Sequence, residues 1–315
     1  TYKGRSLLED HVSKLIASDG TFSQYSLNYH RFMLDTCSFI EAWRNHRGLE
    51  AFSEKFIKKL KVTTEWLWTF INDQNGKVPN IGANDGSQIL QLLRTNYSDY
   101  RPSVQLAASL FMNVDAFGDG LWNEPLYWLN IKKGNYKKKI ESITFDKGGY
   151  HVLRNQKSVA VLNYPQFQFR PSQSDALHVD LWVNGKNLLK DGGTFSYNST
   201  LTNWFMSTAA HNTIEFDKRN QMPHISRFLF GDWLKSNQIK SIKKNDNYLS
   251  VSASYSDNLN NSHQRKIILN ENELICLDKI SGNFKEACLR WRLINGDWQI
   301  NEQTYSYKNY PISIK

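Results

Sequence analysis

The spacing of apolar residues divides the chain into two parts. Up to about residue 115, apolar side chains recur at every third or fourth position, as in helices with one buried face. Helices are expected over roughly residues 7–16, 27–43, 49–72, 87–93 and 103–108. Loops that contain glycine separate these segments, so the pattern predicts a stack of antiparallel helical hairpins over residues 1–120.

After about residue 142, apolar and polar residues alternate over short segments, as they do in β-strands. Residues 158–162 and 177–183 are clear examples, and Asn184-Gly185 after the second is a strong signal for a hairpin turn. We therefore expect an antiparallel β-sandwich over residues 142–315. The segment 121–141 is expected to connect the two domains of this α+β chain.

Composition narrows the class of protein and of partner. The hydrophobic content of 40% and the charged content of 22% are ordinary for a globular protein and exclude a disordered one. The formal net charge of +9 favours a polyanionic partner, either an acidic polysaccharide or a nucleic acid. The longest basic run, Lys137–Lys139, falls in the expected connection and is explained as a solvated charge run, so no nucleic acid is expected.

The cysteines and the hydropathy of the chain argue against a disulfide-rich protein, a cysteine zinc cluster and a membrane-spanning protein. The three cysteines, Cys37, Cys276 and Cys288, are odd in number and show no Cys-x-x-Cys spacing, so neither a disulfide framework nor a zinc cluster of cysteines is implied. No apolar run reaches the length of about 18 residues that a membrane span needs. No signal-peptide pattern is visible, which leaves the compartment open.

Three groups of residues carry candidate chemistry. They are residues 19–31, residues 170–178 together with Asp191-Gly192-Gly193-Thr194, and the string Ser207-Thr208-Ala209-Ala210-His211-Asn212-Thr213. In this order they resemble the heparinase II/III-like family of polysaccharide lyases, and the resemblance covers nearly the whole chain. The string around His211 with the upstream Asp191 is quite specific, whereas the pair Tyr29-His30 alone is a weak signal.

The resemblance implies a fold and a reaction. The fold would be part of an (α/α) toroid of helical hairpins followed by a β-sandwich. The reaction would be β-elimination at a uronic acid, in which a base removes the C5 proton and an acid protonates the leaving oxygen on C4. The substrate would be an acidic polysaccharide and the location periplasmic or secreted. The family's Asn-His motif, which holds the sugar carboxylate, has its place before Thr1.

The resemblance also implies catalytic residues. Tyr29 would be the base or the acid, with Asn28, His30 and His178 as further candidates. A phenol ionises near pH 10, so a catalytic base at Tyr29 needs nearby cations. Spacing alone favours Tyr29 as a helix-packing aromatic residue, and the resemblance reverses that preference. Asn28 near the start of a helix is also explained as a cap.

Four arginines are candidates for binding acidic sugars through paired hydrogen bonds. They are Arg31, Arg94, Arg101 and Arg170. For any single one of them, the residue type alone favours a surface ion pair over substrate binding. The loop of residues 80–86 resembles a cleft loop of the family, although ordinary turn chemistry also accounts for it.

A metal site is implied in the β-domain by Gln173, Asp191 and His211. Zinc prefers histidine and carboxylate ligands, while a glutamine oxygen suits a harder cation such as calcium. The metal would be structural and would brace the strands that face the cleft.

One departure from the family pattern opens an alternative. A histidine that takes part in catalysis in relatives is replaced here by Pro171, which cannot titrate. Arg170 or His178 is expected to substitute for it. The alternative hypothesis is a non-catalytic relative that binds an acidic polysaccharide.

Overall fold

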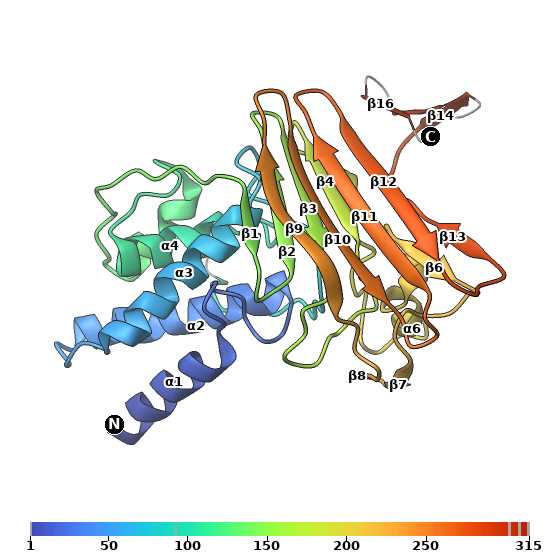
Figure 1. The fold of residues 1–315 in the computed structure, drawn as a ribbon. Helices are drawn as coiled ribbons and strands as arrows, with labels where there is room; N and C mark the ends of the chain where they lie inside the picture. The colour runs from blue at the N-terminus through green and yellow to red at the C-terminus, as the bar shows by residue number, and fades with distance from the viewer. Residues whose placement is uncertain (1, 92, 302–303, 308–309, 314–315) are drawn as a thin grey trace.

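The computed structural model describes residues 2–91, 93–301, 304–307 and 310–313. Helices occupy the first part of the chain and antiparallel strands the second, and Figure 1 shows the two parts side by side. The helices are α1 (Tyr2–Leu15), α2 (Leu27–His46), α3 (Glu54–Phe70), α4 (Arg101–Met112) and α5 (Glu124–Trp128), with a short 3₁₀ turn η1 (Leu121–Asn123) before α5.

Local side-chain chemistry fixes where the two longest helices begin. The Ser26 hydroxyl accepts a hydrogen bond from the Tyr29 amide at 3.1 Å and so caps the start of α2. Ser53 caps α3 in the same way through the Phe56 amide. The cap at Ser53 explains why α3 starts at Glu54, after the position near residue 49 that the apolar pattern predicts.

The helix expected over residues 87–93 is wrong, because the described residues of this segment are irregular backbone with a bend at Ile89. Asn84 accepts a hydrogen bond from the Gly86 amide at 2.9 Å, and Asp85 accepts one from the Ser87 amide at 2.9 Å. Side chains of this kind satisfy backbone groups locally and compete with helix formation. The segment is therefore a loop, and it reaches the candidate site described below.

The strands form two main sheets and several small ones. The first sheet has the order β1-β2-β3-β4-β5, and the second has the order β12-β11-β10-β9. The strands of the first are β1 (Ile143–Phe145), β2 (Tyr150–Arg154), β3 (Ser158–Asn163), β4 (Val179–Val183) and β5 (Lys186–Leu189). Those of the second are β9 (Ser236–Lys244), β10 (Leu249–Ser256), β11 (Ser262–Leu269) and β12 (Leu274–Ser281).

Smaller elements lie around the two sheets. Strand β13 (Ala287–Leu289) pairs with β6 (Ile214–Phe216), and β7 (His224–Ser226) pairs with β8 (Leu229–Phe230). Strands β14 (Trp298–Asn301), β15 (Thr304–Tyr307) and β16 (Tyr310–Ser313) make a separate antiparallel sheet. A short helix α6 (Thr202–Phe205) and a 3₁₀ turn η2 (Thr208–Ala210) precede β6.

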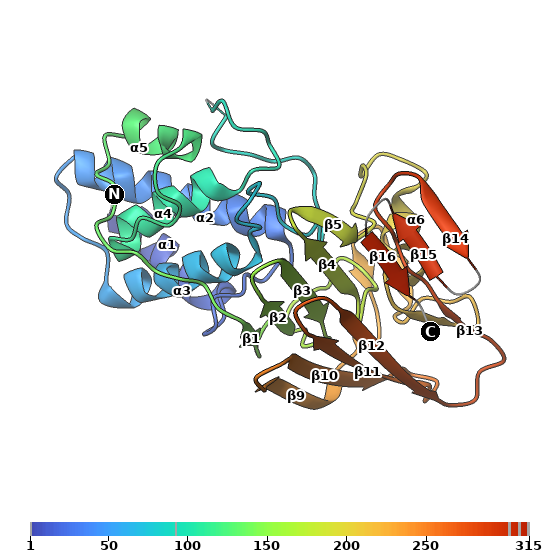
Figure 2. The ribbon, with the colours of Figure 1, turned by 90° about the horizontal axis from the view of Figure 1, so that it is seen from above.

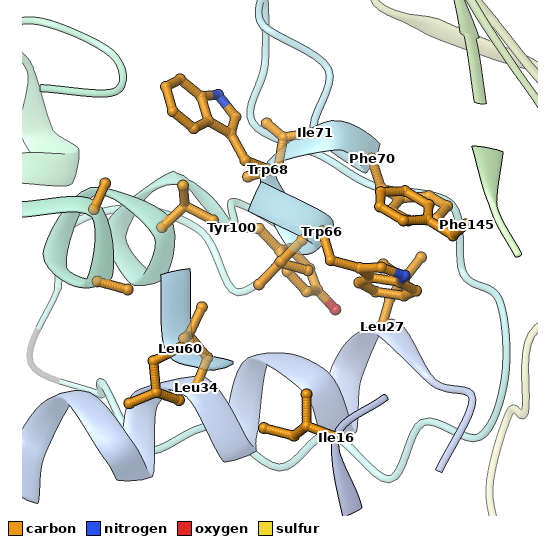
Figure 3. Close-up of a cluster of buried hydrophobic side chains, with 14 of the residues drawn as sticks. Ile16, Leu27, Leu34, Leu60, Trp66, Trp68, Phe70, Ile71, Tyr100 and Phe145 are labelled. Atoms are coloured by element: carbon orange, nitrogen blue, oxygen red, sulfur yellow. The ribbon is translucent and has the colours of Figure 1, made fainter. Parts of the chain in front are cut away.

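The first sheet is the middle of three layers, which Figure 2 shows from above. In β3, Val159 and Val161 belong to the core shared with the helices, whereas Ala160 and Leu162 belong to the core shared with the second sheet. A strand buried on both faces joins the two parts of the chain into one hydrophobic structure. Figure 3 shows the helical side of this contact around Trp66.

The prediction of helices followed by antiparallel strands is confirmed. The hairpin turn predicted at Asn184-Gly185 joins β4 to β5, and both residues adopt positive φ as such a turn requires. The connection predicted over residues 121–141 includes η1 and α5, which the sequence pattern did not reveal. The toroid and the domain boundaries stay predictions.

Candidate active site

A pocket of about 180 Å³ lies between the helical part and the loops of the β-part. It is lined by residues from both, namely Gln24, Tyr29, Ala83, Arg170, Ser172, Thr194, Tyr197, Met206 and Phe228. Tyr29 is thus placed in a pocket and not between helices, and its side chain is partly exposed.

The Tyr29 hydroxyl has two partners. It donates a hydrogen bond to Asp85 Oδ2 at 2.9 Å, and its oxygen lies 3.1 Å from the Tyr197 hydroxyl. Because the Tyr29 proton points to the carboxylate, Tyr197 is the donor of the second bond. Residues of α2, of the 80–100 loop and of the loop after β5 therefore meet at one hydroxyl group.

Asn28 and Arg31 lie behind the pocket and support its loops. The Asn28 side-chain oxygen accepts hydrogen bonds from Arg31 Nη2 at 2.9 Å and from the Tyr97 hydroxyl at 2.8 Å. Arg31 is only 1% exposed and stacks on the rings of Tyr97 and Tyr100. Neither residue lines the pocket. Asn28 donates to the Asp85 carboxylate at 3.4 Å, and Arg31 donates to the Tyr97 carbonyl at 2.6 Å.

The electrostatics around Tyr29 are opposite to those expected for a tyrosine base. Burial raises the pKa of Tyr29 above its ordinary value, and the hydrogen bonds with Tyr197 and Asp85 raise it further. Burial alone would also raise the pKa of Asp85, but hydrogen bonds from Ser87 and Tyr29 hold it below its ordinary value. Tyr29 is therefore a neutral proton donor beside a carboxylate.

His30 lies inside the helical core. It is fully buried, stacks on Trp66 with the ring centres 4.3 Å apart, and forms a hydrogen bond of 3.0 Å with the Thr63 carbonyl. Burial lowers the pKa of His30 to about 3, so the ring is neutral. His30 therefore has a packing role. It follows Tyr29 directly in the helix, and consecutive helical residues point to different faces.

Of the four predicted arginines, only Arg170 lines the pocket. Arg94 pairs with Glu124 on the surface, and Arg101 pairs with Asp99 while stacking on Trp122. Arg31 is buried as described. Arg170 donates a hydrogen bond to the Phe228 carbonyl at 2.8 Å.

A buried cluster of His178, Asp191 and His211 lies in the β-part. Asp191 Oδ2 is 3.0 Å from His211 Nδ1 and 3.6 Å from His178 Nε2, and the three residues offer ligand atoms within 4.8 Å of one another. The predicted meeting of Asp191 and His211 is therefore observed. His178, predicted as catalytic, is fully buried in this cluster and does not line the pocket.

Charge is unevenly shared in the cluster. Burial lowers the pKa of His178 to about 3. Burial would also lower the pKa of His211, but the attraction and hydrogen bond of Asp191 raise it above its ordinary value. The same pairing outweighs burial at Asp191 and keeps its pKa low. The cluster thus contains an ion pair of Asp191 with His211 beside a neutral His178.

Gln173 lies beside this cluster but uses its amide on the backbone. Its oxygen accepts a hydrogen bond from the Gly82 amide at 2.9 Å, and its nitrogen donates to the Gly193 carbonyl at 3.1 Å. Gly193 in turn donates to Asp191 Oδ1 at 2.7 Å. Gln173 thereby ties the pocket loop at Gly82 to the turn that carries Asp191.

Asp191 and His211 fit a divalent metal in residue type, and the buried His211 Nε2 has no partner among the described residues. His178 does not fit as a third ligand. Its Nδ1 accepts the Asn212 amide hydrogen at 3.0 Å, so the neutral ring carries its proton on Nε2, the atom that faces Asp191. In this structure Asp191, His178 and His211 thus form a hydrogen-bonded cluster and not a complete set of metal ligands.

Arg265 of β11 holds the two backbone segments that carry these histidines. Its Nη1 donates to the carbonyls of Leu177 and Asn212, the residues next to His178 and His211. Its other nitrogens pair with Asp278 of β12 at 2.7 and 3.0 Å, and the Arg265 side chain is fully buried. The second sheet thus fixes the spacing of the two histidine segments.

Comparison with known proteins identifies the family. Residues 137–305 match the C-terminal domain of heparinase II/III-like proteins. The chain belongs to the heparinase II/III-like family. A heparin-sulfate lyase of Bacteroides thetaiotaomicron is 24% identical over 241 residues, which cover 69% of this chain and 33% of the relative. A heparin-sulfate lyase of Bacteroides stercoris is 25% identical, with 63% and 39% covered.

Solved structures of heparinases share the fold. A heparinase III superposes with a TM-score of 0.75 at 19% identity, covering 96% of this chain and 45% of the other. A heparan sulfate lyase mutant from Pedobacter heparinus gives a TM-score of 0.72 at 18% identity, with the same coverage. The heparinase II/III-like chain described here thus spans less than half the length of these relatives.

Sequence reasoning missed several residues of this heparinase II/III-like site. Asp85 lies in a loop that was noted only as a whole, and Tyr197 lies three residues after the Gly-Gly-Thr motif without a motif of its own. Nothing in the one-dimensional pattern links Arg265 to the histidine segments. Their common signal is a polar or aromatic residue in a loop next to a recognised motif, which is too frequent to be selective.

Proposed function

We propose that this heparinase II/III-like chain belongs to a polysaccharide lyase that cleaves a uronate-containing polysaccharide by β-elimination. The proposal is carried by one observation: the Tyr29 side chain lines a pocket between the two parts that Arg170 also lines. The names of the sequence relatives, both heparin-sulfate lyases, favour a glycosaminoglycan as substrate. The formal net charge of +9 favours attraction of such a polyanion.

The pocket provides what an elimination requires from protein groups. Tyr29 is a hydroxyl with a held orientation that can give or take a proton at a sugar carbon or oxygen. Arg170 supplies positive charge next to the place of the uronate, where negative charge develops. The remaining lining residues contribute small polar groups and the rings of Tyr197 and Phe228, surfaces suited to a sugar ring.

A non-catalytic polysaccharide-binding protein is the second candidate. It is favoured by Pro171, which offers no titratable group at the position expected for a catalytic histidine. The two candidates differ in one measurable respect. A lyase creates a conjugated double bond in the product and a binding protein does not.

We also propose a metal site and a location for this protein. A structural divalent metal, zinc or calcium, is proposed at Asp191 and His211, where it would brace the segments below the pocket. A periplasmic or secreted location is proposed from the family. Among the helices that the structure describes, none is both long and apolar enough to cross a membrane.

The test of function is the ultraviolet absorbance of the unsaturated uronate. The protein, in its full natural length, is incubated with uronate polymers of graded sulfation. We expect absorbance to rise with at least one polymer, and Tyr29→Phe to lower turnover by at least about 100-fold. The matched control is Tyr127→Phe, because Tyr127 is 79% exposed on α5. No rise with any polymer that the protein binds would support the binding-only candidate.

A further inference from the structure

The second sheet has one face against the first sheet and one face turned outward. Val251 and Tyr255 of β10 belong to the core shared with the first sheet. Successive residues of a strand point to opposite faces, so Ser250, Ser252 and Ser254 point outward. In Figure 2 the second sheet runs along one side of the molecule, and none of the described elements is drawn beyond it. This outer face is thus open to a partner.

A β-bulge brings two lysines of β9 onto the outer face. Residues that are directly opposite each other in an antiparallel pair have their side chains on the same face. Lys240 is opposite Ser252. Lys243 is opposite Ser250, so β9 advances by three residues where β10 advances by two. In a regular strand Lys240 and Lys243 would lie on opposite faces, and the bulge places both on the outer one.

Two further lysines reach the same face from the neighbouring strands. Lys266 of β11 is opposite Ser252, and Lys279 of β12 is opposite Gln264, which is on the outer face as well. No Asp or Glu occupies an outer-face position in the described part of the four strands. All four lysines are exposed, and the ion pairs of the described residues include none of them. We call these residues the outer-face lysines: Lys240, Lys243, Lys266 and Lys279.

Edge protection explains only part of this arrangement. A strand at the edge of a sheet commonly carries lysines that keep it from pairing with another chain. β9 is an edge strand, so this accounts for Lys240 and Lys243. Lys266 lies on the interior strand β11, and its two cross-strand neighbours, Ser252 and Leu277, carry no charge. Like charges gathered on one face repel one another, and a bound polyanion would remove that repulsion.

The basic area is bounded on one side by acidic turns. The turn of residues 245–248, between β9 and β10, contains Asp246. The turn of residues 270–273, between β11 and β12, contains Glu271 and Glu273 and lies at the same end of the sheet. From β9 to β12 the area is three strand spacings wide, about 14 Å. A polyanion is therefore expected to lie across the strands and away from these turns.

The other side chains of this face suit a sugar chain. They include serine hydroxyls and the Gln264 amide, which can form hydrogen bonds with sugar hydroxyls. Single-stranded nucleic acid is commonly held by aromatic rings on which its bases stack, and phosphates are commonly held by arginine. The described outer-face positions contain neither an aromatic residue nor an arginine. The residue types thus favour an acidic polysaccharide over a nucleic acid.

We propose that the outer face of the second sheet is a second binding surface for an acidic polysaccharide, separate from the pocket. The outer-face lysines attract the carboxylates or sulfates of the chain, and the serine and glutamine side chains contact its hydroxyls. The proposal goes beyond the proposed function, because it applies to a lyase and to a binding protein alike. A polymer held at this surface stays at a raised local concentration near the pocket.

Binding of dextran sulfate tests the proposal without any enzymatic activity. This sulfated polysaccharide contains no uronate, so β-elimination cannot cleave it. Two variants of the protein in its full natural length, each with the same loss of positive charge, are compared with wild type by titration calorimetry. The outer-face variant is Lys240→Gln/Lys243→Gln/Lys266→Gln/Lys279→Gln. The control variant changes exposed lysines on other elements: Lys3→Gln/Lys55→Gln/Lys132→Gln/Lys285→Gln.

The two variants should differ clearly in affinity. At low salt the outer-face variant should bind dextran sulfate at least about 10-fold more weakly than wild type, because the lost charges act together on one chain. Its plot of log Kd against log salt concentration should also be shallower. The control variant should lose less than about 3-fold, because scattered charges are screened from the polymer. Lys→Arg exchange at the four outer-face positions should keep the affinity, because the positive charge is kept.

Three results would overturn the proposal. Equal weakening in both variants would show that net charge alone attracts the polymer. Wild-type affinity in the outer-face variant would show that the polymer binds elsewhere. Single-stranded DNA that binds more tightly than dextran sulfate, and loses its affinity in the outer-face variant, would make this face a nucleic-acid surface. The lyase proposal is tested separately, because a protein that cleaves no uronate polymer can still bind dextran sulfate here.

Discussion

Removal of the Arg265 guanidinium tests how the second sheet supports the site. Arg265 and Asp278 are directly opposite each other on β11 and β12 and form paired hydrogen bonds in a buried setting. Breaking a buried ion pair by removing one partner costs about 3–5 kcal/mol. The carbonyls of Leu177 and Asn212 lose their donor as well, and such losses are not additive. Arg265→Met should therefore lower the free energy of unfolding by about 4 kcal/mol.

The size of this loss should depend on pH because of His263. Its Nε2 lies 2.7 Å from Asp278 Oδ1, and burial lowers the pKa of His263 to about 4 with a further contribution from the Arg265 charge. Without the Arg265 charge, the pKa of His263 should rise, because the hydrogen bond with Asp278 favours the charged histidine. A higher pKa of a histidine in the folded state stabilises the protein at low pH, and this stabilisation is lost as the pH rises. The loss in Arg265→Met should thus be smaller at pH 5.5 than at pH 8.

Urea unfolding followed by tryptophan fluorescence measures the effect. The double variant Arg265→Met/Asp278→Leu should be less destabilised than Arg265→Met, because no unpaired charge remains. The smaller losses that persist are the donor to the Leu177 and Asn212 carbonyls and the hydrogen-bond partner of His263. Arg94→Met is the control, since Arg94 is 75% exposed and its pair with Glu124 is worth at most about 1 kcal/mol. An Arg265→Met protein within about 1 kcal/mol of wild type, or a double variant worse than either single one, would refute the reasoning.

Three further predictions concern other parts of the molecule. Burial raises the pKa of Asp35 from 3.8 to about 7. Stability should therefore fall by up to about 4 kcal/mol between pH 4 and 8, and Asp35→Asn should flatten that dependence in unfolding curves. If a metal binds at Asp191 and His211, added Zn²⁺ or Ca²⁺ should raise the melting temperature of chelator-treated protein, and His211→Ala should abolish the increase. Arg170→Gln should raise KM for the polymer, whereas Arg94→Gln should leave it unchanged in steady-state assays.

The sequence predicted the site where the chemistry lies in a local motif. Asp191 and His211 belong to short strings with a recognisable order, and the structure brings their side chains to 3.0 Å. Tyr29 was selected by resemblance, because helical spacing alone allows a packing aromatic residue at the same position. The change from helical to strand periodicity likewise follows from residue spacing, which is a local property.

Residues whose role depends on depth or on a distant partner could not be predicted in this way. His178 alternates with apolar neighbours, which indicates a strand but not that the ring is buried beside Asp191. His30 was a catalytic candidate by resemblance, and burial in the helical core removes it from the pocket. Arg94 was a substrate-binding candidate by residue type, and it forms a surface pair with Glu124. The partner of Tyr29 across the pocket, Tyr197, comes from a loop whose course only the folded chain defines.

The mass of the cleavage product tests the central proposal most directly. Elimination breaks the bond without adding water, so each new non-reducing end is lighter by one water molecule than the end that hydrolysis would leave. After digestion of a uronate polymer by the protein in its full natural length, mass spectrometry should find unsaturated ends in place of saturated ones. Products that carry saturated ends, or an intact polymer that the protein nevertheless binds, would contradict the proposal that this heparinase II/III-like protein is a lyase.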